Sequence, residues 1–240
     1  MAKGKIYLIP NLLGGEQWSD VLPEMVKENA IALRFFAVEN IKSARRFLRR
    51  LDRTFPIDES EFFEINKRTN PEELQAILRE VKNGKDCGVI SEAGCPGIAD
   101  PGADLVALAH SSGIHVVPHV GPSSIFMALM ASGFSGQSFA FHGYLPKERK
   151  QRIKQLKEME RNVKYTKQTQ LFMETPFRNM NLLEDLLNEL MDDTLLCVAC
   201  DITLPTEHIQ TMTVKAWRDN AFDLSKRPTI FALGSFGVNG

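Results

Sequence analysis

The sequence has only four cysteines among its 240 residues, and its net charge is -1. Four cysteines are too few for the disulfide framework on which small secreted proteins depend. The balance of 29 basic and 30 acidic residues excludes a strong overall electric field, so any binding of nucleic acid must come from a local basic surface. A hydrophobic share of 43% and a charged share of 25% are typical of globular proteins and exclude collagen and disordered chains.

Long hydrophobic runs are also missing from the sequence. The first 15 residues contain one short apolar run, residues 6–9, whereas a signal peptide needs about 7–15 apolar residues. No stretch approaches the roughly 20 apolar residues of a membrane-spanning helix. We therefore expect a cytoplasmic protein with reduced cysteines.

Short apolar runs alternate with amphipathic stretches through the first half of the chain, which indicates a parallel sheet covered by helices. Strands are expected at residues 5–10, 31–38, 61–65, 86–91 and 114–118, and helices at residues 18–29, 40–53, 71–82 and 123–132. From about residue 137 the pattern changes, and residues 201–214, with Pro205 inside, indicate an irregular antiparallel piece. We expect an α/β protein with two domains, residues 1–119 and residues 120–240.

The most unusual segment is residues 91–102, which read Ser-Glu-Ala-Gly-Cys-Pro-Gly-Ile-Ala-Asp-Pro-Gly. A connection from strand to helix usually takes about 2–6 residues, so this longer run of small residues favours a ligand-binding loop over an ordinary connection. It follows an expected parallel strand, and ligands bind at the carboxyl ends of such strands. Asp100 and Pro101 are expected to begin the next helix as its N-cap and first-turn proline. A second loop contains Ser123 and Ser124, which either cap a helix or meet polar ligand atoms.

These segments resemble motifs of the ribosomal RNA small-subunit methyltransferase I family, within the tetrapyrrole-methylase-like class of S-adenosylmethionine-dependent enzymes. Residues 91–102 resemble the family's S-D-A-G-T-P-x-I-S-D-P-G, residues 120–124 its P-G-P-S, residues 141–146 its F-x-G-F-L-P, and residues 172–178 its F-Y-E-S-P-H-R. Residues 37–40, followed by residues 45–48, resemble A-E-D-T-R-H-T-R-R-L-L. Glu92, Cys95 and Asn40 replace an Asp, a Thr and an acid of these motifs, which indicates a divergent member.

The resemblance implies two α/β domains of the tetrapyrrole methylase type, with a mainly parallel N-terminal sheet, a mixed C-terminal sheet and a cofactor cleft between the domains. It also implies a homodimer, S-adenosyl-L-methionine as the cofactor, and no metal. The cofactor-binding residues that it implies are Pro10, Ser91, Glu92, Ala93, Gly94, Cys95, Ile98, Ser123, Ser124, Phe172 and Met173.

Methyl transfer to a ribose hydroxyl benefits from a group that takes the proton, because the hydroxyl is a poor nucleophile. Glu39 and Glu174 are the predicted candidates, with Arg178 and Asn66 orienting the substrate. Glu174 and Arg178 lie four residues apart, so the alternative for them is a structural ion pair.

Two basic segments are predicted to contact ribosomal RNA or the small ribosomal subunit. The first is the expected helix after Asn40, and the second is residues 147–167, with nine basic residues against three acidic ones. The predicted contacts are Lys42, Arg45, Arg46, Arg49, Lys147, Arg149 and Lys150. The alternative for both segments is a solvated helix face.

Cys197 and Cys200 fall within one expected strand, where an odd offset places them on opposite faces, so we expect buried core cysteines rather than a metal or redox pair. The leading interpretation is a 2′-O-methyltransferase of small-subunit ribosomal RNA. Two alternatives stay open, because a fold does not fix a function. One is a methyltransferase of a tetrapyrrole or another small molecule, and the other is a non-catalytic descendant that binds cofactor or RNA.

Overall fold

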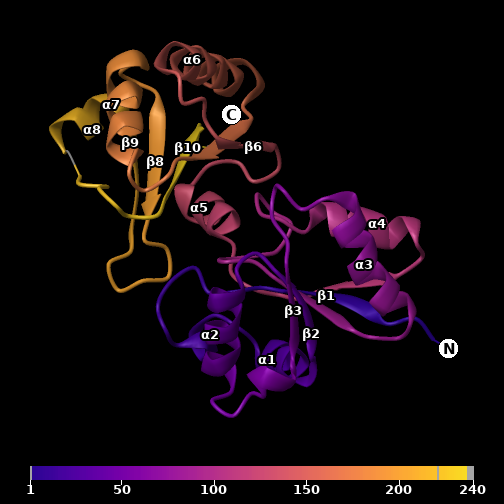
Figure 1. Cartoon of the computed structure of the whole chain (residues 1–240). Helices are drawn as coiled ribbons and strands as arrows, with labels where there is room; N and C mark the ends of the chain where they lie inside the picture. Colours follow the sequence, from indigo (N-terminus) through magenta and orange to yellow (C-terminus); the bar gives the residue numbers. More distant parts are fainter. Residues whose placement is uncertain (1, 221, 237–240) are drawn as a thin grey trace. The chain divides into compact units, whose positions relative to one another are not determined.

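The computed structural model describes residues 2–220 and 222–236, and the chain divides into two compact units between Ser123 and Ser124 (Figure 1). Each unit contains its own five-stranded sheet and its own hydrophobic core. The expected α/β class, with a parallel first sheet and a mixed second sheet, is confirmed. In the described part of the chain, no helix combines the length and apolar character that crossing a bilayer requires.

The first unit contains a wholly parallel sheet with the strand order β3-β2-β4-β1-β5. Its strands are β1 (Lys5–Ile9), β2 (Phe35–Val38), β3 (Glu61–Glu64), β4 (Cys87–Ile90) and β5 (His115–Pro118). The inner strands β2 and β4 are buried along their whole length, as parallel strands covered on both faces are. All five strands run the same way, so the loops that follow them emerge at one edge of the sheet.

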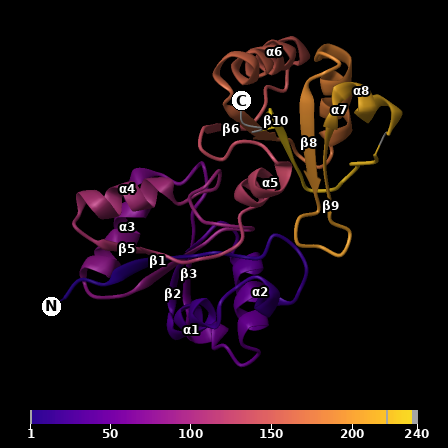
Figure 2. The ribbon, with the colours of Figure 1, turned by 180° about the vertical axis from the view of Figure 1, so that it is seen from behind.

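Two pairs of helices cover the two faces of this sheet, as Figures 1 and 2 show. Side chains alternate along each strand, so Phe36 and Val38 pack on α1 (Glu24–Ala32) and α2 (Ile41–Leu51). Phe35 and Ala37 face the other way, toward α3 (Pro71–Lys82) and α4 (Ala103–Ser111). The short 3₁₀ helices η1 (Trp18–Asp20) and η2 (Ile57–Glu59) complete the unit.

The expected helix at residues 18–29 is wrong at both ends. The chain forms η1, and α1 begins only after Pro23, which is its N-cap residue, because proline disfavours helical backbone in the residue before it. The helix then continues to Ala32, since Val26 and Ala30 lie on its buried face. Strand β2 consequently begins at Phe35 rather than at residue 31.

The second unit contains a mixed sheet with the order β6-β7-β10-β8-β9, in which only β6 and β7 pair in parallel. Its strands are β6 (Phe139–Tyr144), β7 (Thr169–Met173), β8 (Leu195–Cys200), β9 (His208–Thr213) and β10 (Thr229–Gly234). Its helices are α5 (Ser124–Ser132), α6 (Arg149–Thr166), α7 (Asn179–Glu189) and α8 (Val214–Asp219). Strand β9 confirms the expected antiparallel piece, whereas α8 was not predicted.

The core of the second unit is built on its central strands. The rings of Phe172 and Phe231 stack with their centroids 5.8 Å apart. The indole of Trp217 is buried and donates a hydrogen bond of 2.8 Å to the carbonyl oxygen of Leu196. Cys197 and Cys200 are fully buried in β8 as free thiols, which confirms their prediction as core residues.

Gly121 sets the packing of the loop after β5 on the end of β1. A Cβ atom at Gly121 would lie 2.2 Å from the Cβ and Cγ atoms of Pro10, and a proline ring has little freedom to move away. Gly121→Ala is therefore expected to lower the free energy of unfolding by about 2 kcal/mol, the usual effect of overpacking. Urea denaturation of the full chain measures this loss.

Gly136→Ala is the matched control, because a Cβ atom at Gly136 would meet no atom within 4 Å. Equal unfolding free energies for the two variants would contradict the close packing of Gly121 on Pro10.

Candidate functional site

The loop after β4, residues 91–102, is tied to the loop after β1 by the buried residue Asn11. Its backbone exchanges hydrogen bonds with Gly94, 2.9 Å from Asn11 N to Gly94 O and 3.1 Å in the other direction. Its side-chain Nδ2 atom donates to the carbonyl oxygens of Ser91 and Glu92, both at 3.0 Å. Pro10 is among the predicted cofactor-binding residues and Asn11 is not, because a polar residue after a strand is common in loops.

The same loop is also tied to the end of β2. The Glu39 carboxylate accepts a hydrogen bond of 2.9 Å from the backbone N–H of Glu92. The exposed Glu92 carboxylate in turn accepts one of 3.1 Å from the Ser43 hydroxyl in the first turn of α2. These contacts bring Glu39 and Glu92 together, one from the predicted catalytic set and one from the predicted cofactor-binding set.

Within this loop, Gly94 has no side chain at the point where the loop packs closely on neighbouring residues. Gly94 has a φ of 68°, and a Cβ atom there would lie 3.3 Å from Leu13 Cδ2 and 3.5 Å from the carbonyl oxygen of Pro122. The Cys95 thiol lies 3.5 Å from the same carbonyl oxygen. Ser91 is buried, whereas Glu92, Ala93 and Ile98 are exposed, so part of the loop is open to a ligand.

The remaining predicted cofactor-binding residues lie outside this loop. Pro10 directly follows β1 and packs against Gly121, as described above, and Ser123 is the last residue of the first unit. Ser124 begins α5 in the second unit, and Phe172 and Met173 lie in β7. The Phe172 side chain is fully buried in the core, so only its backbone is left for a ligand. Their roles stay predictions.

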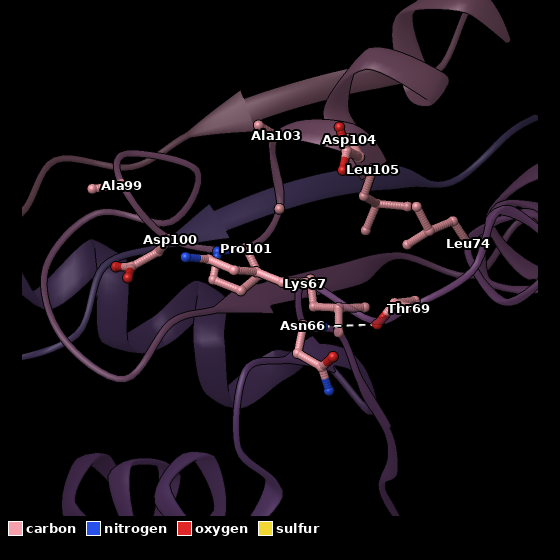
Figure 3. Close-up of a pocket in the computed structure, with 12 residues that line it drawn as sticks. Asn66, Lys67, Thr69, Leu74, Ala99, Asp100, Pro101, Ala103, Asp104 and Leu105 are labelled. Carbon is pink, nitrogen blue, oxygen red and sulfur yellow. Dashed lines mark hydrogen bonds between the residues drawn. The ribbon is translucent and has the colours of Figure 1, made fainter. Parts of the chain in front are cut away.

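The expectation that Asp100 and Pro101 begin a helix is wrong. Helix α4 begins at Ala103, and its N-cap residue Gly102 has a φ of 124°, which interrupts helical backbone just before it. Asp100 and Pro101 therefore remain in the loop and line a pocket of about 170 Å³ with Asn66 and Lys67 (Figure 3). In Figure 3 the Lys67 side chain extends toward Asp100.

Asn66 shapes the turn on the other side of this pocket. Its backbone N–H donates to the Thr69 hydroxyl at 2.7 Å, and its side-chain oxygen accepts from the backbone N–H of Arg68 at 2.8 Å. Its Nδ2 atom donates to the Glu64 carboxylate at 3.3 Å. Asn66 thus lies at the pocket, but its polar atoms already serve the loop after β3.

Asp100 is the most perturbed acid of the pocket. Partial burial, and after it the negative charges of Glu39 and Glu92, raise the pKa of its carboxyl to about 6, and the positive charge of Lys67 opposes this shift. A carboxyl that titrates near 6 is suited to taking up a proton close to neutral pH. Asp100 is not among the predicted site residues, because Asp-Pro is also a typical helix start. Its place in the unusual loop was the available signal.

Glu174 and Arg178, at the end of β7, form an ion pair. The Glu174 side chain is only 1% exposed, and it also accepts a hydrogen bond of 2.6 Å from the backbone N–H of Thr175. Arg178 is 29% exposed and donates to the Thr175 hydroxyl at 3.3 Å. This is the arrangement that the structural alternative requires, and a catalytic role for either residue stays a prediction.

The predicted RNA contacts on α2 are exposed. Lys42, Arg45, Arg46 and Arg49 all lie on the surface of this helix. The Arg45 guanidinium lies over the Phe62 ring, 5.1 Å from its centroid, and Arg49 donates to the Arg53 carbonyl oxygen at 2.5 Å. Lys42 and Arg46 make no ion pair within the described residues. Their predicted role is untested by these contacts.

The second basic segment is less available than its charge count implies. Arg152 is buried against Asp185 at 2.6 Å and is not a surface residue, and Arg149 binds the other oxygen of the same carboxylate at 2.8 Å. Arg149 also reaches Glu189 at 3.4 Å. Lys147 and Lys150 are exposed.

Within the described residues, no three His, Cys, Asp or Glu side chains are grouped so that they could hold a metal ion.

Comparisons with known proteins identify what this fold resembles. A model of the family described as tetrapyrrole (corrin/porphyrin) methylases matches residues 27–217. The chain is 33% identical over 185 residues to ribosomal RNA small subunit methyltransferase I of Halalkalibacterium halodurans, a match that covers 77% of this chain and 60% of that protein. The same-named protein of Haemophilus influenzae is 32% identical over 158 residues, which cover 66% of this chain and 54% of that protein.

Two solved structures share the fold of the chain. The methyltransferase CobJ superposes with a TM-score of 0.64 at 16% identity, covering 97% of this chain and 94% of that one. Cobalt precorrin-4 methyltransferase gives a TM-score of 0.58 at 17% identity, covering 96% of this chain and 94% of that one. These two structures confirm the fold of the chain. The similarity in sequence is to the two relatives described above.

The raised pKa of Asp100 predicts how stability changes with pH. The carboxyl binds its proton more tightly in the folded chain, so its contribution to stability is present at low pH and is lost as pH rises from about 4 to about 6. Asp100→Asn removes this loss. We expect the variant to gain up to about 1 kcal/mol over the wild type between pH 4 and pH 8, since water screens a partly exposed group.

Thermal melting across this pH range measures the gain, with the exposed neighbour Asp104→Asn as the control. A constant stability difference between Asp100→Asn and the wild type at all pH values would contradict the shift.

The Glu174–Arg178 pair predicts unequal effects of removing its two members. Arg178→Ala leaves a buried carboxylate without its partner and is expected to cost about 3 kcal/mol of unfolding free energy. Glu174→Gln leaves an arginine that water can reach, so about 1–2 kcal/mol is expected. Urea denaturation of both variants measures the difference, and equal losses would show that Glu174 is not held as a buried charge.

Proposed function

Because the chain belongs to the tetrapyrrole methylase family, we propose that it is an S-adenosyl-L-methionine-dependent methyltransferase acting on a ribose 2′-hydroxyl of small-subunit ribosomal RNA. The observation that carries this proposal is the loop at residues 91–102, held at the carboxyl edge of a parallel sheet, where ligands bind. Relatives named ribosomal RNA small subunit methyltransferase I support the substrate class. The matched region spans 60% and 54% of these two relatives, so the substrate is part of the proposal.

The loop fits the cofactor that this family implies. Its members Glu92, Ala93 and Ile98 are exposed and open to a ligand. When bound, S-adenosyl-L-methionine supplies an activated methyl group on a positively charged sulfur. The carboxylates of Glu39, Glu92 and Asp100 complement such a cation. In this proposal the residues that hold the cofactor are Pro10, Ser91, Glu92, Ala93, Gly94, Cys95, Ile98, Ser123, Ser124, Phe172 and Met173.

The chain's own chemical contribution is to take the proton of the acceptor hydroxyl. Asp100 fits this role best, because its carboxyl lies in a pocket and its pKa is raised to about 6. Glu39 fixes the loop through the Glu92 N–H and raises the Asp100 pKa with its charge. Asn66 and Lys67 line the same pocket, and in this proposal the Lys67 ammonium and the second N–H of the Asn66 amide orient the substrate. Glu174 and Arg178 are positioning residues in this proposal. Their ion pair holds the Glu174 carboxylate on the backbone N–H of Thr175, just after β7.

Ribosomal RNA as the substrate implies a cytoplasmic location. The family resemblance implies a homodimer, and light scattering of the purified chain tests it.

Transfer of labelled methyl groups tests the activity itself. Purified chain with labelled S-adenosyl-L-methionine is expected to methylate RNA of the small ribosomal subunit, and mapping of the labelled nucleotide is expected to place the methyl group on a ribose 2′-oxygen. Uroporphyrinogen and precorrin-type tetrapyrroles are offered in parallel. Labelling of a tetrapyrrole instead of RNA would replace the proposed substrate class, and cofactor binding without any transfer would favour a non-catalytic binding protein.

The pH dependence of this transfer tests the role of Asp100. The wild-type rate is expected to rise through about pH 6 as the carboxyl loses its proton, and Asp100→Asn is expected to lower the rate about 100-fold and to abolish this rise. Glu39→Gln removes a neighbouring negative charge, so it is expected to move the rise to lower pH. Calorimetry with S-adenosylhomocysteine is the control for binding. An Asp100→Asn rate equal to that of the wild type would remove Asp100 from the reaction.

A further inference from the structure

Helix α6 presents a straight stripe of basic side chains. Residues 150, 154, 157, 161 and 164 are spaced by four, three, four and three, and this spacing places them on one side of a helix. We call them the α6 stripe: Lys150, Lys154, Lys157, Arg161 and Lys164, all exposed. The stripe runs for about 21 Å at 1.5 Å per residue.

The α6 stripe is largely uncompensated by acidic neighbours. Among the described residues, Lys157 alone of the five forms an ion pair, at 3.1 Å from Glu189. This differs from the neighbouring face of α6, where Arg149 and Arg152 are both held by Asp185. Some basic side chains of α6 are therefore neutralised within the unit, and the others are available to an anionic partner.

A polar groove of about 330 Å³ lies beside the stripe, between α6 and β6. Amide side chains of α6 line it at Gln151, Gln155 and Asn162, together with Glu158 and Met159, and Lys154 of the stripe borders it. Amides offer both donors and acceptors, as the edges of nucleobases do. The groove thus adds a means of contacting bases to a stripe that attracts phosphates.

His142 closes the groove from the side of β6 and has a defined hydrogen-bonding state. Its Nε2 atom lies 2.8 Å from Oε1 of the buried Gln170, whose Nε2 atom donates to the Gln168 carbonyl oxygen at 2.9 Å. Since the Gln170 oxygen can only accept, His142 donates from Nε2, and its Nδ1 atom is the acceptor in the neutral ring.

Tyr165 lies at the boundary between the α6 stripe and the groove. It follows Glu158, a groove residue, by seven positions, which brings it back to the same side of the helix after two turns. Tyr165 as a whole is 77% exposed. An exposed aromatic ring beside a basic track is the arrangement on which bases of single-stranded nucleic acids stack.

We propose that α6 binds a single-stranded segment of RNA, with phosphates along the α6 stripe, one base stacked on Tyr165 and a neighbouring base in the groove. The choice of RNA rests on the proposed function. A membrane surface is disfavoured, because the apolar residues Leu156, Met159 and Val163 are buried in the core and leave α6 no apolar face to insert.

Fluorescence anisotropy with a labelled 12-nucleotide single-stranded RNA and the full chain tests this site. Reversal of three stripe charges (Lys154→Glu, Arg161→Glu and Lys164→Glu) is expected to weaken binding at least tenfold. The slope of log affinity against log salt concentration is expected to fall by about 2, since each lost phosphate contact on a single strand removes about 0.7. The matched control carries the same charge change at three exposed positions elsewhere, Arg79→Glu, Lys82→Glu and Lys215→Glu.

Tyr165→Ala tests stacking separately from charge. It is expected to weaken RNA binding about tenfold with an unchanged salt slope, whereas Tyr165→Phe keeps the ring and is expected to bind as the wild type does. Circular dichroism and thermal melting check that each variant is folded. Inorganic polyphosphate is the competing probe. It is expected to bind the α6 stripe with the same affinity in the wild type and in Tyr165→Ala.

The outcomes separate this inference from the proposed function. RNA affinity that falls equally in the control triple variant, or that is unchanged in Tyr165→Ala, would overturn the site on α6. Wild-type methyl transfer to RNA with an unaltered KM in the α6 variants would also overturn it and leave the proposed function standing. RNA binding that depends on the stripe and on Tyr165, without methyl transfer to any RNA, would support the site and refute the proposed function.

Discussion

The shared direction of five strands is the constraint on which the first unit depends. Because β1 to β5 are all parallel, five loops leave the sheet at one edge, and their backbone groups must find partners without a sheet to supply them. Asn11 meets this need for two loops at once, through backbone bonds to Gly94 and side-chain bonds to the carbonyls of Ser91 and Glu92. The unusual loop is therefore a fixed part of the edge, and its bare glycine backbone faces neighbours at defined distances.

The placement of carboxylates separates this edge from the rest of the molecule. In the second unit, the buried acids have cationic partners: Asp185 binds Arg149 and Arg152, Glu174 binds Arg178, and Asp201 binds Arg227 at 2.8 Å. At the edge of the first unit, Glu39, Glu92 and Asp100 gather with Lys67 opposing them, and partial burial together with the two neighbouring charges raises the pKa of Asp100. Carboxylates that repel one another destabilise the folded chain. Their grouping is understandable when the site receives a cation or a proton, which is the chemistry of the proposed reaction.

Sequence patterns predicted the elements well and their ends less well. Residues 71–82 form α3 with both ends as expected, because Asn70 and Glu73 form a capping box and the apolar spacing is regular. The start of α4 was misplaced because Asp-Pro is typical of a helix start, whereas the backbone turns at Gly102. The same misreading hid Asp100 from the candidate site. Arg152 was counted as a surface charge because its partner Asp185 is 33 residues away, beyond any local pattern. Asn11 holds two loops together and Lys67 lines the pocket beside Asp100, and neither position could be predicted because both depend on residues distant in the sequence.

Helix α6 illustrates how one amphipathic segment can serve three purposes. Its apolar side chains, among them Leu156 and Val163, belong to the core of the second unit. A second face is neutralised by α7, where Asp185 and Glu189 take up Arg149, Arg152 and Lys157. The charges that remain, at Lys150, Lys154, Arg161 and Lys164, form no ion pair within the described residues, and Lys154 borders the groove. A near-neutral chain attracts RNA only where cations are concentrated and left unpaired. Because some basic residues of α6 pair with α7, the surface available to a partner consists of the basic residues that stay unpaired within the described residues.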